Sequence, residues 1–380
     1  MTPSSVLRSP GVPLVVAMTA LAFSGYSALM PVAPLWAAAG GADAGGVGLV
    51  NGVLMGTTVL TQLMVPASLR KFGWVLVLVT GTLFLGLPTI RLFFSDSLEA
   101  ILAVSALRGI GFGIITVTGS ALIAELVDPL RRGEAIGVYG LAVAAPQILF
   151  MSTGPWFAER FGFATMFAIG VLPIFGAVPA YILGGRMEAV PKPQERAPYT
   201  NLLRPIFLLL AVTLAGGAII TFLAQMVSEP WLAMVGLLLL TVFAAATRWR
   251  LGGLADRFGA QRFVWPLVVS TTVGMVVIAY AVRGDSHVAA LLTGTALVGI
   301  GYGGLQNLTL LLAFDGVKRV HYGSASAAWN IGFDAGTGLG SVVIGAVAAS
   351  SSFSTAMLVG GAVSLLTLPL AFKQTPKVTG

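Results

Sequence analysis

Residues 106–113 read Ala-Leu-Arg-Gly-Ile-Gly-Phe-Gly, and residues 296–303 read Ala-Leu-Val-Gly-Ile-Gly-Tyr-Gly, so one motif returns at an offset of 190. The same offset places Gly133 on Gly323 and Tyr139 on Trp329. These segments belong to the fourth and fifth long apolar stretches of their respective halves. A repeat at one fixed offset indicates that the chain consists of two related halves.

The composition indicates a membrane protein. The chain has 380 residues, of which 57% are apolar and only 9% are charged, and its mean hydropathy is +0.93. A soluble domain carries about 25% charged residues because its surface is wetted by water. So little charge is expected only where most of the surface faces hydrocarbon.

A membrane-spanning helix needs roughly 20 apolar residues. Twelve spans are expected on this basis, at 12–38, 47–69, 74–94, 99–124, 134–157, 163–183, 205–227, 231–250, 263–282, 288–314, 324–348 and 354–372. The first is too long for a cleaved signal peptide. The expected fold is an all-α membrane protein with about twelve transmembrane helices in two six-helix pseudo-repeats, residues 1–185 and 205–380, joined by a polar cytoplasmic linker at 186–204.

The basic residues predict the orientation. Cytoplasmic loops are enriched in Lys and Arg. With the N-terminus inside, the inner side receives 17 of the 21 Lys and Arg residues, Arg248 among them. We therefore expect a multi-pass protein of the cell inner (plasma) membrane with both termini cytoplasmic.

Several function classes are excluded or disfavoured. The net charge of +7 resides in short loop clusters, so nucleic-acid binding is not expected. The chain has no cysteine and two histidines, His287 and His321, so no metal site is expected. It has no Walker motif and no nucleophile–base constellation in its spans, so we expect neither a cofactor nor an enzyme. The expected partners are a small-molecule substrate, protons and the lipid bilayer, and the expected state is a monomer.

Residues 252–262 read Gly-Gly-Leu-Ala-Asp-Arg-Phe-Gly-Ala-Gln-Arg. This stretch resembles the loop signature Gly-x-Leu-Ala-Asp-Arg-x-Gly-Arg-Arg of the major facilitator superfamily of secondary transporters, between the eighth and ninth spans. Two parallel repeats around a central linker are the architecture of that superfamily. The resemblance implies that a loop motif favours one conformation of the transporter, through Gly252, Asp256, Arg257, Gly259 and Arg262.

The first half departs from this pattern. Its counterpart at 66–73 has Arg70 where the aspartate belongs, so the conformational loop motif of this half is altered or absent. The fifth-span signature of antiporters is poor as well, because Phe150-Met151 occupies its Gly-Pro position. Antiport is therefore less well supported than membership of the superfamily.

Two charges are expected near the bilayer midplane, where an unpartnered charge costs at least a few kcal/mol. Arg108 lies in a context similar to the fourth-helix arginine motif of proton-coupled members. It could favour the charged form of a carboxylate, contact an anionic substrate, or tie helices together through backbone carbonyls. Asp334 could carry a proton or contact substrate, or it could have a structural hydrogen-bonding role.

Glu125 lies near the inner end of the fourth span and shares a helix face with Asp128. It belongs either to a salt-bridge cluster or to a proton exit station. Polar residues that could line a substrate cavity, or join helices by hydrogen bonds, are Tyr26, Asn51, Gln62, Gln147, Gln225, Gln306, Asn307, Trp329 and Asn330. The Gly-x-Gly-x-Gly spacing at 109–113 lies inside a span and is expected to serve helix packing.

The sequence thus predicts a transporter that works by alternating access. The favoured function is proton-coupled export of a small amphipathic organic compound such as a drug, metabolite or metallophore. Its mixed amide and aromatic residues suit such a ligand better than an inorganic ion. Import of a small nutrient, such as a sugar or organic acid, by a symporter or facilitator is the alternative.

Overall fold

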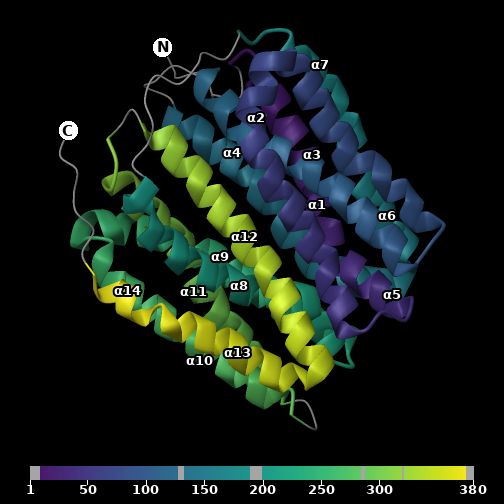
Figure 1. Cartoon of the computed structure of the whole chain (residues 1–380), viewed down its shortest axis with the longest axis vertical. Helices are drawn as coiled ribbons and strands as arrows, with labels where there is room; N and C mark the ends of the chain where they lie inside the picture. The colour runs from purple at the N-terminus through teal and green to yellow at the C-terminus, as the bar shows by residue number, and fades with distance from the viewer. Residues whose placement is uncertain (1–8, 127–131, 189–198, 284–286, 319–320, 374–380) are drawn as a thin grey trace. The chain divides into compact units, whose positions relative to one another are not determined.

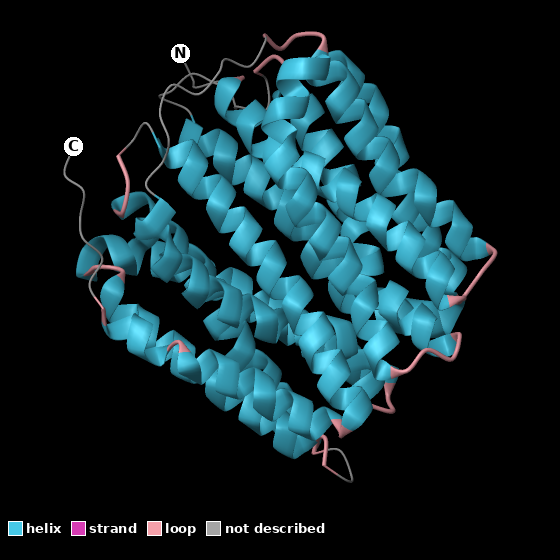
Figure 2. Cartoon of the chain, viewed as in Figure 1, coloured by secondary structure: helices cyan, strands magenta, loops and turns pink. Residues whose placement is uncertain are grey.

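A computed structural model of the chain describes residues 9–126, 132–188, 199–283, 287–318 and 321–373. These residues form helices and connecting loops, and none of them lies in a strand (Figures 1 and 2). Within this described part, ten helices are long and apolar enough to cross a membrane. Helices suit such a sequence because they satisfy all their backbone hydrogen bonds internally. The predicted all-α membrane fold is confirmed.

Two features bring ten crossings to the predicted twelve. The segment Ala44–Phe93 counts as one of the ten, but its helix α2 (Ala44–Gly86) bends at Gly73, where φ is 75° and ψ is 170°. Its two arms therefore cover the predicted second and third spans. In addition, α4 (Arg132–Pro146), η4 (Gln147–Met151) and α5 (Ser152–Phe161) form one run of helix. At 1.5 Å per residue this run is about 45 Å long, enough to cross a bilayer.

The chain divides into two compact units. Unit 1 comprises Met1–Ala33 and Gly56–Lys192, and unit 2 comprises Pro34–Met55 and Pro193–Gly380. The boundary between Lys192 and Pro193 falls inside the predicted linker, whose residues 189–198 lie outside the described residues. The segment 34–55 belongs to unit 2 by its contacts, whereas the sequence-based division placed it in the first half.

The helices of unit 1 are labelled in chain order in Figure 1. They are α1 (Val12–Ala39) as far as Ala33, α2 from Gly56, η2 (Leu87–Phe93), α3 (Leu98–Glu125), α4, η4, α5, α6 (Phe163–Val171), η5 (Leu172–Gly176) and α7 (Ala177–Gly184). Pro146 and Pro155 lie within the α4–α5 run, which contains a π-helical stretch at η4.

Unit 2 contains the end of α1, the start of α2 and the helices of the second half. The latter are η6 (Tyr199–Leu202), α8 (Leu203–Met226), α9 (Pro230–Phe258), α10 (Gln261–Ala281), α11 (Val288–Asp315), α12 (Tyr322–Ser350), α13 (Phe353–Leu366) and α14 (Leu368–Phe372). Its apolar core joins α8 to α12 and includes Leu208, Val212, Leu305 and Trp329.

The sequence repeat is a repeat of whole helices. Helix α3 covers 98–125 and α11 covers 288–315, so both ends are shifted by the offset of the motif. Helix α12 begins at Tyr322 and α4 at Arg132, which is the same shift, and so is that between the starts of α13 and α6. The offset found in the motif therefore holds from the fourth span of each half onward.

The repeated glycines of α3 and α11 allow close helix packing. A Cβ atom at Gly111 would lie 2.6 Å from the Gly81 carbonyl oxygen, and one at Gly113 would lie 2.7 Å from that of Thr58. In the second copy, a Cβ at Gly303 would overlap the carbonyl oxygen of Ala244 on α9. Such contacts exclude any side chain, so the motif serves helix packing as expected.

Candidate functional site

The loop motif ends one helix and starts another. Gly252 lies within α9, which continues to Phe258, and Gly259 follows with φ of 84°. Glycine adopts such a positive φ without steric cost, and Gly73 does the same at the bend of α2. Arg257 and Arg262 are exposed, while the Asp256 side chain lies outside the described part. The proposed conformational role of this motif stays a prediction.

Arg108 of α3 is buried, with 1% of its surface exposed. Its Nε donates to the Leu85 carbonyl at 3.2 Å, and its Nη2 donates to the Gly25 carbonyl at 2.9 Å. No carboxylate in the described part of the chain forms a salt bridge with it. The guanidinium thus links α1, α2 and α3 through backbone carbonyls, one of the three roles considered, and the other two stay predictions.

The other predicted site residues of unit 1 are an aromatic ring, two amides and a carboxylate. The Tyr26 ring stacks on Phe112 with centroids 3.8 Å apart, and the Tyr26 hydroxyl lies within electrostatic reach of Arg108. Gln62 donates from Nε2 to the Thr116 hydroxyl at 3.1 Å. Gln147 is partly buried in the π-helical stretch η4. Glu125 is the last residue of α3, and its side chain lies outside the described part.

Unit 2 brings a carboxylate and a guanidinium to the same tyrosine. Asp334 on α12 has 3% of its surface exposed, and Tyr302 on α11 lies within electrostatic reach of both Asp334 and Arg248. The side chains of Tyr302 and Gln306 are hydrogen-bonded. Arg248 on α9 donates from Nη1 to the Gln306 Oε1 at 3.4 Å. The sequence prediction named Asp334 and Gln306 but not the two residues that interact with them, Tyr302 and Arg248.

Aromatic residues flank this group. Trp329 donates from Nε1 to the Thr309 hydroxyl at 3.0 Å, and its ring lies 5.7 Å from that of Phe333. The Phe333 ring is in turn 6.0 Å from Tyr302. Asn307 donates from Nδ2 to the Arg248 carbonyl at 2.7 Å, while the Asn330 amide bonds its own helix at the Ser326 carbonyl.

The remaining predicted amides of unit 2 form a separate polar group. Asn51 donates from Nδ2 to the Thr221 hydroxyl at 2.9 Å, and that hydroxyl is 2.8 Å from Ser341 Oγ. Gln225 donates to the Thr221 carbonyl at 3.2 Å. The bonds of Thr221 join α2, α8 and α12 through buried side chains, which is the structural alternative weighed for such residues.

Sequence reasoning missed Arg248 and Tyr302 as site residues. Arg248 was counted with the inner loops, but α9 continues ten residues beyond it to Phe258. Tyr302 could have been found from the repeat. It occupies the position of Phe112 in the second copy, where the ring carries an additional hydroxyl group.

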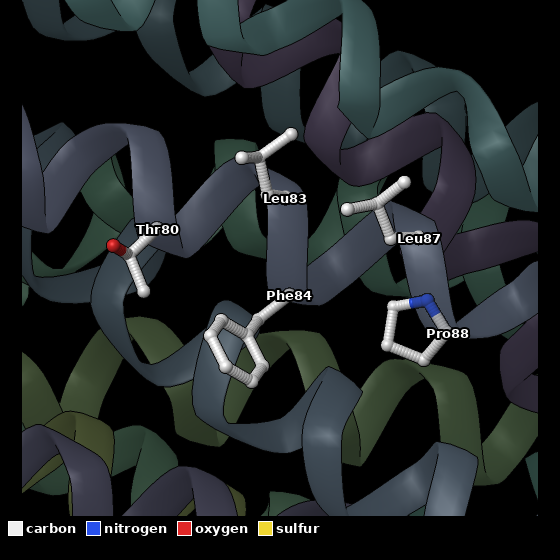
Figure 3. A pocket seen from close by; sticks show the side chains of 5 residues that line it. All are labelled: Thr80, Leu83, Phe84, Leu87 and Pro88. Carbon is white, nitrogen blue, oxygen red and sulfur yellow. The ribbon is translucent and has the colours of Figure 1, made fainter.

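Two concave apolar sites lie elsewhere. One, of about 230 Å³, is lined by Thr80, Leu83, Phe84, Leu87 and Pro88 of α2 and η2 (Figure 3). Thr80 supplies the only side-chain oxygen among them. The other, of about 190 Å³, lies among η4, α5 and α6. Neither contains a charged group, so we place the candidate site at the polar residues of unit 2 instead.

Comparisons with known proteins agree with this fold. The sequence profile of the Major Facilitator Superfamily matches residues 15–319 and, in a second match, 232–380. The Synaptic vesicular amine transporter of Bos taurus is 24% identical over 344 residues, which cover 86% of this chain and 65% of that protein. The chain thus spans somewhat less than two thirds of the length of this relative.

Two solved structures share the fold. A bacterial homologue of the human lysosomal transporter Spinster superposes with a TM-score of 0.76 at 14% identity, covering 97% of each chain. An auto-inhibited POT family peptide transporter superposes with a TM-score of 0.77 at 12% identity, covering 97% of this chain and 98% of the other. At such identities the likeness concerns the fold alone. Since the family profile covers nearly the whole chain, the chain belongs to the Major Facilitator Superfamily.

Proposed function

We propose that the chain is a secondary transporter that works by alternating access and exports a small amphipathic organic compound in exchange for protons. The observation that carries this proposal is the buried carboxylate of Asp334, twelve residues from the start of α12. Helix α12 is long and apolar enough to span a membrane. A carboxylate at that depth is costly while it is charged, so binding a proton there lowers the free energy of the buried side chain.

The neighbours of Asp334 support proton exchange. Tyr302 lies within electrostatic reach of Asp334 and of Arg248, and Gln306 accepts a hydrogen bond from Arg248. These polar groups can reorient as the carboxylate gains or loses a proton. In unit 1, Arg108 and Glu125 are candidates for assisting the same coupling. The chain has no Walker motif, so a proton gradient is the energy source that we propose.

An organic substrate is supported by the aromatic rings near Asp334 and by the relatives. Flat apolar molecules pack well on Tyr, Phe and Trp side chains. The relative in Bos taurus carries the word amine in its name, and an ammonium group would pair with a carboxylate. We propose that the protein acts as a monomer in the plasma membrane with both termini cytoplasmic, as the distribution of Lys and Arg suggests.

Import of a small organic acid is the second candidate. Arg248 favours it, because its exposed guanidinium can bind a carboxylate in a bidentate manner. The direction of the imposed gradient separates the two candidates. An exporter accumulates substrate in inverted vesicles that are acidic inside, whereas a symporter accumulates it in right-side-out vesicles that are acidic outside.

The test uses the full chain in proteoliposomes loaded with a pH-sensitive dye. Outward proton flux is recorded after addition of amphipathic amines or weak acids. We expect Asp334→Asn to reduce substrate-dependent proton flux at least about tenfold, and to reduce substrate exchange without a gradient to a smaller extent. Asp315→Asn is the matched control, because Asp315 is exposed at the end of α11. Unchanged proton flux in Asp334→Asn would refute the proposed coupling.

A further inference from the structure

Arg248 and Asp334 present opposite charges from two helices of unit 2, with Tyr302 within electrostatic reach of both. We propose that they form a binding site for a small dipolar molecule. Its anionic group pairs with Arg248 and its cationic group pairs with Asp334. Its apolar body packs on the aromatic rings beside Tyr302. This inference rests on the proposed transport function and names its substrate class.

Arg248 is available for an anion. It is exposed, and its guanidinium makes one long hydrogen bond, 3.4 Å to Gln306. The described part of the chain holds no carboxylate in a salt bridge with it and no other hydrogen bond from its guanidinium. Five N–H donors in a planar fork match a carboxylate. Most of that capacity remains for a ligand.

The backbone around Arg248 is fixed. Asn307 donates to its carbonyl at 2.7 Å, which ties α9 to α11. Close contact of the same helices at Gly303, where a Cβ would overlap the Ala244 carbonyl oxygen, limits their movement further. The guanidinium therefore extends from a rigid base rather than from a loop, and a rigid base lowers the entropy lost on binding.

Asp334 provides the negative charge of the site, at a buried position. Only 3% of its surface is exposed, and Tyr302 beside it is partly buried. In the proposed site, the cationic group of the ligand pairs with this carboxylate next to Tyr302. The Tyr302 ring lies over Gly216, where a Cβ would be 2.5 Å from Cδ2 and closer still to Cε2. That glycine leaves room for the ring on α8.

The rings beside the two charges suit an apolar body. Phe333 is 6.0 Å from Tyr302 and 5.7 Å from Trp329, measured between ring centroids. Trp329 is held by its hydrogen bond to Thr309. Aromatic faces bind flat apolar groups and attract cations. The site thus offers a guanidinium, a carboxylate and a group of aromatic rings that includes the tyrosine within reach of both charges.

A ligand with both charges fits this arrangement better than one with a single charge. A simple amine would interact with Asp334 alone, and a simple acid would interact with Arg248 alone. Each would also bring a net charge to membrane depth, where an uncompensated charge costs at least a few kcal/mol. A dipolar ligand interacts with both residues and adds no net charge to the span.

The test measures equilibrium binding to the full chain in lipid nanodiscs without a pH gradient. The probes share one scaffold: phenethylamine is cationic, phenylalanine is dipolar and 3-phenylpropanoate is anionic, with naphthyl analogues as a second set. We expect the dipolar probe to bind at least about tenfold more tightly than either singly charged probe, which corresponds to roughly 1.4 kcal/mol.

Substitutions at two residues separate the contributions of the two charges. Arg248→Gln should lower the affinity for the dipolar probe about tenfold and leave that for the amine unchanged, whereas Arg248→Lys should retain part of the preference. Asp334→Asn should remove the advantage of the dipolar probe over the acid. Arg250→Gln is the control, since Arg250 is exposed two residues further along α9 and carries the same charge.

Equal binding of amine and dipolar probe, an equal effect of Arg250→Gln, or no binding of any probe would overturn the dipolar site. Failure of this proposal differs from failure of the proposed function. If Asp334→Asn abolishes proton flux while the dipolar preference is absent, coupling stands and the substrate class is wrong. If the preference is present while proton flux is unaffected, the binding site stands and the coupling is wrong.

Discussion

Replacing Gly303 by alanine tests whether α9 and α11 pack along their backbones. A Cβ atom at Gly303 would overlap the Ala244 carbonyl oxygen and lie 2.5 Å from the Ala244 Cα. Ordinary van der Waals contact begins at 3.4 Å, so the two helices must move apart locally. The obstructing atoms belong to the backbone of a helix and cannot rotate away.

Overpacking of a tight interior costs about 1–3 kcal/mol, and the upper end applies here because no side chain can yield. A shift of 1 kcal/mol changes Tm by about 2–4 °C in a protein of roughly 200 residues, and by about half as much in this chain of 380 residues, because the entropy of unfolding scales with length. The expected fall in Tm for Gly303→Ala is therefore about 2–6 °C, measured by thermal unfolding of the purified chain in nanodiscs.

Two further glycines make this prediction refutable. Gly113 is the first-half counterpart, where a Cβ would lie 2.7 Å from the Thr58 carbonyl oxygen, so Gly113→Ala should cost less than Gly303→Ala. At Gly140 of α4 a Cβ meets nothing within 4 Å, so Gly140→Ala should leave Tm unchanged or raise it. The packing argument would be refuted if Gly303→Ala had the Tm of the wild type, or if the three variants lost Tm in the reverse order.

Substitutions at two other residues test smaller parts of unit 2. Gly216→Ala should push the Tyr302 ring, whose Cδ2 would lie 2.5 Å from the new Cβ, and weaken binding of the dipolar probe about tenfold; unchanged binding would exclude Tyr302 from the site. Arg204 donates to the Leu370 carbonyl at 2.8 Å and to the Gln261 side chain at 2.5 Å, so Arg204→Gln should destabilise the fold by about 1–3 kcal/mol, measured as Tm. Arg204→Lys should restore little of this, because an ammonium lacks the planar fork; full restoration would refute the hydrogen-bond geometry.

The helical repeat was predictable because its signals are local. Apolar length predicts each span, and the motif at 106–113 carries its offset into the helix bounds of α3 and α11. The loop motif at 252–262 is local as well, and its Gly259 ends α9 with a φ of 84°, which glycine adopts without steric cost. These features depend on residues close together in the sequence.

The composition of the site was only partly predictable. A helix that is apolar on all sides has no amphipathic stripe, so the sequence does not reveal which neighbour each face contacts. Arg248 therefore resembled a loop residue, although its guanidinium reaches Gln306 on α11. The bond between Asn51 and Thr221 was hidden for the same reason, since it joins residues 170 positions apart.

The two units show how a repeated scaffold acquires an unequal interior. Phe112 of α3 stacks on Tyr26 of α1; at the equivalent position of the second copy, Tyr302 of α11 lies over Gly216 of α8. The phenol has therefore moved from one helix of the pair to the other, while the glycines that set the helix spacing remain in both copies. In unit 1 the phenol stands near an arginine bonded to backbone carbonyls. In unit 2 it lies within electrostatic reach of a carboxylate and a guanidinium. Because the backbone packing is shared, the chemical difference between the units comes from a few side chains at equivalent positions, and those are the positions where substitution should alter binding without unfolding the chain.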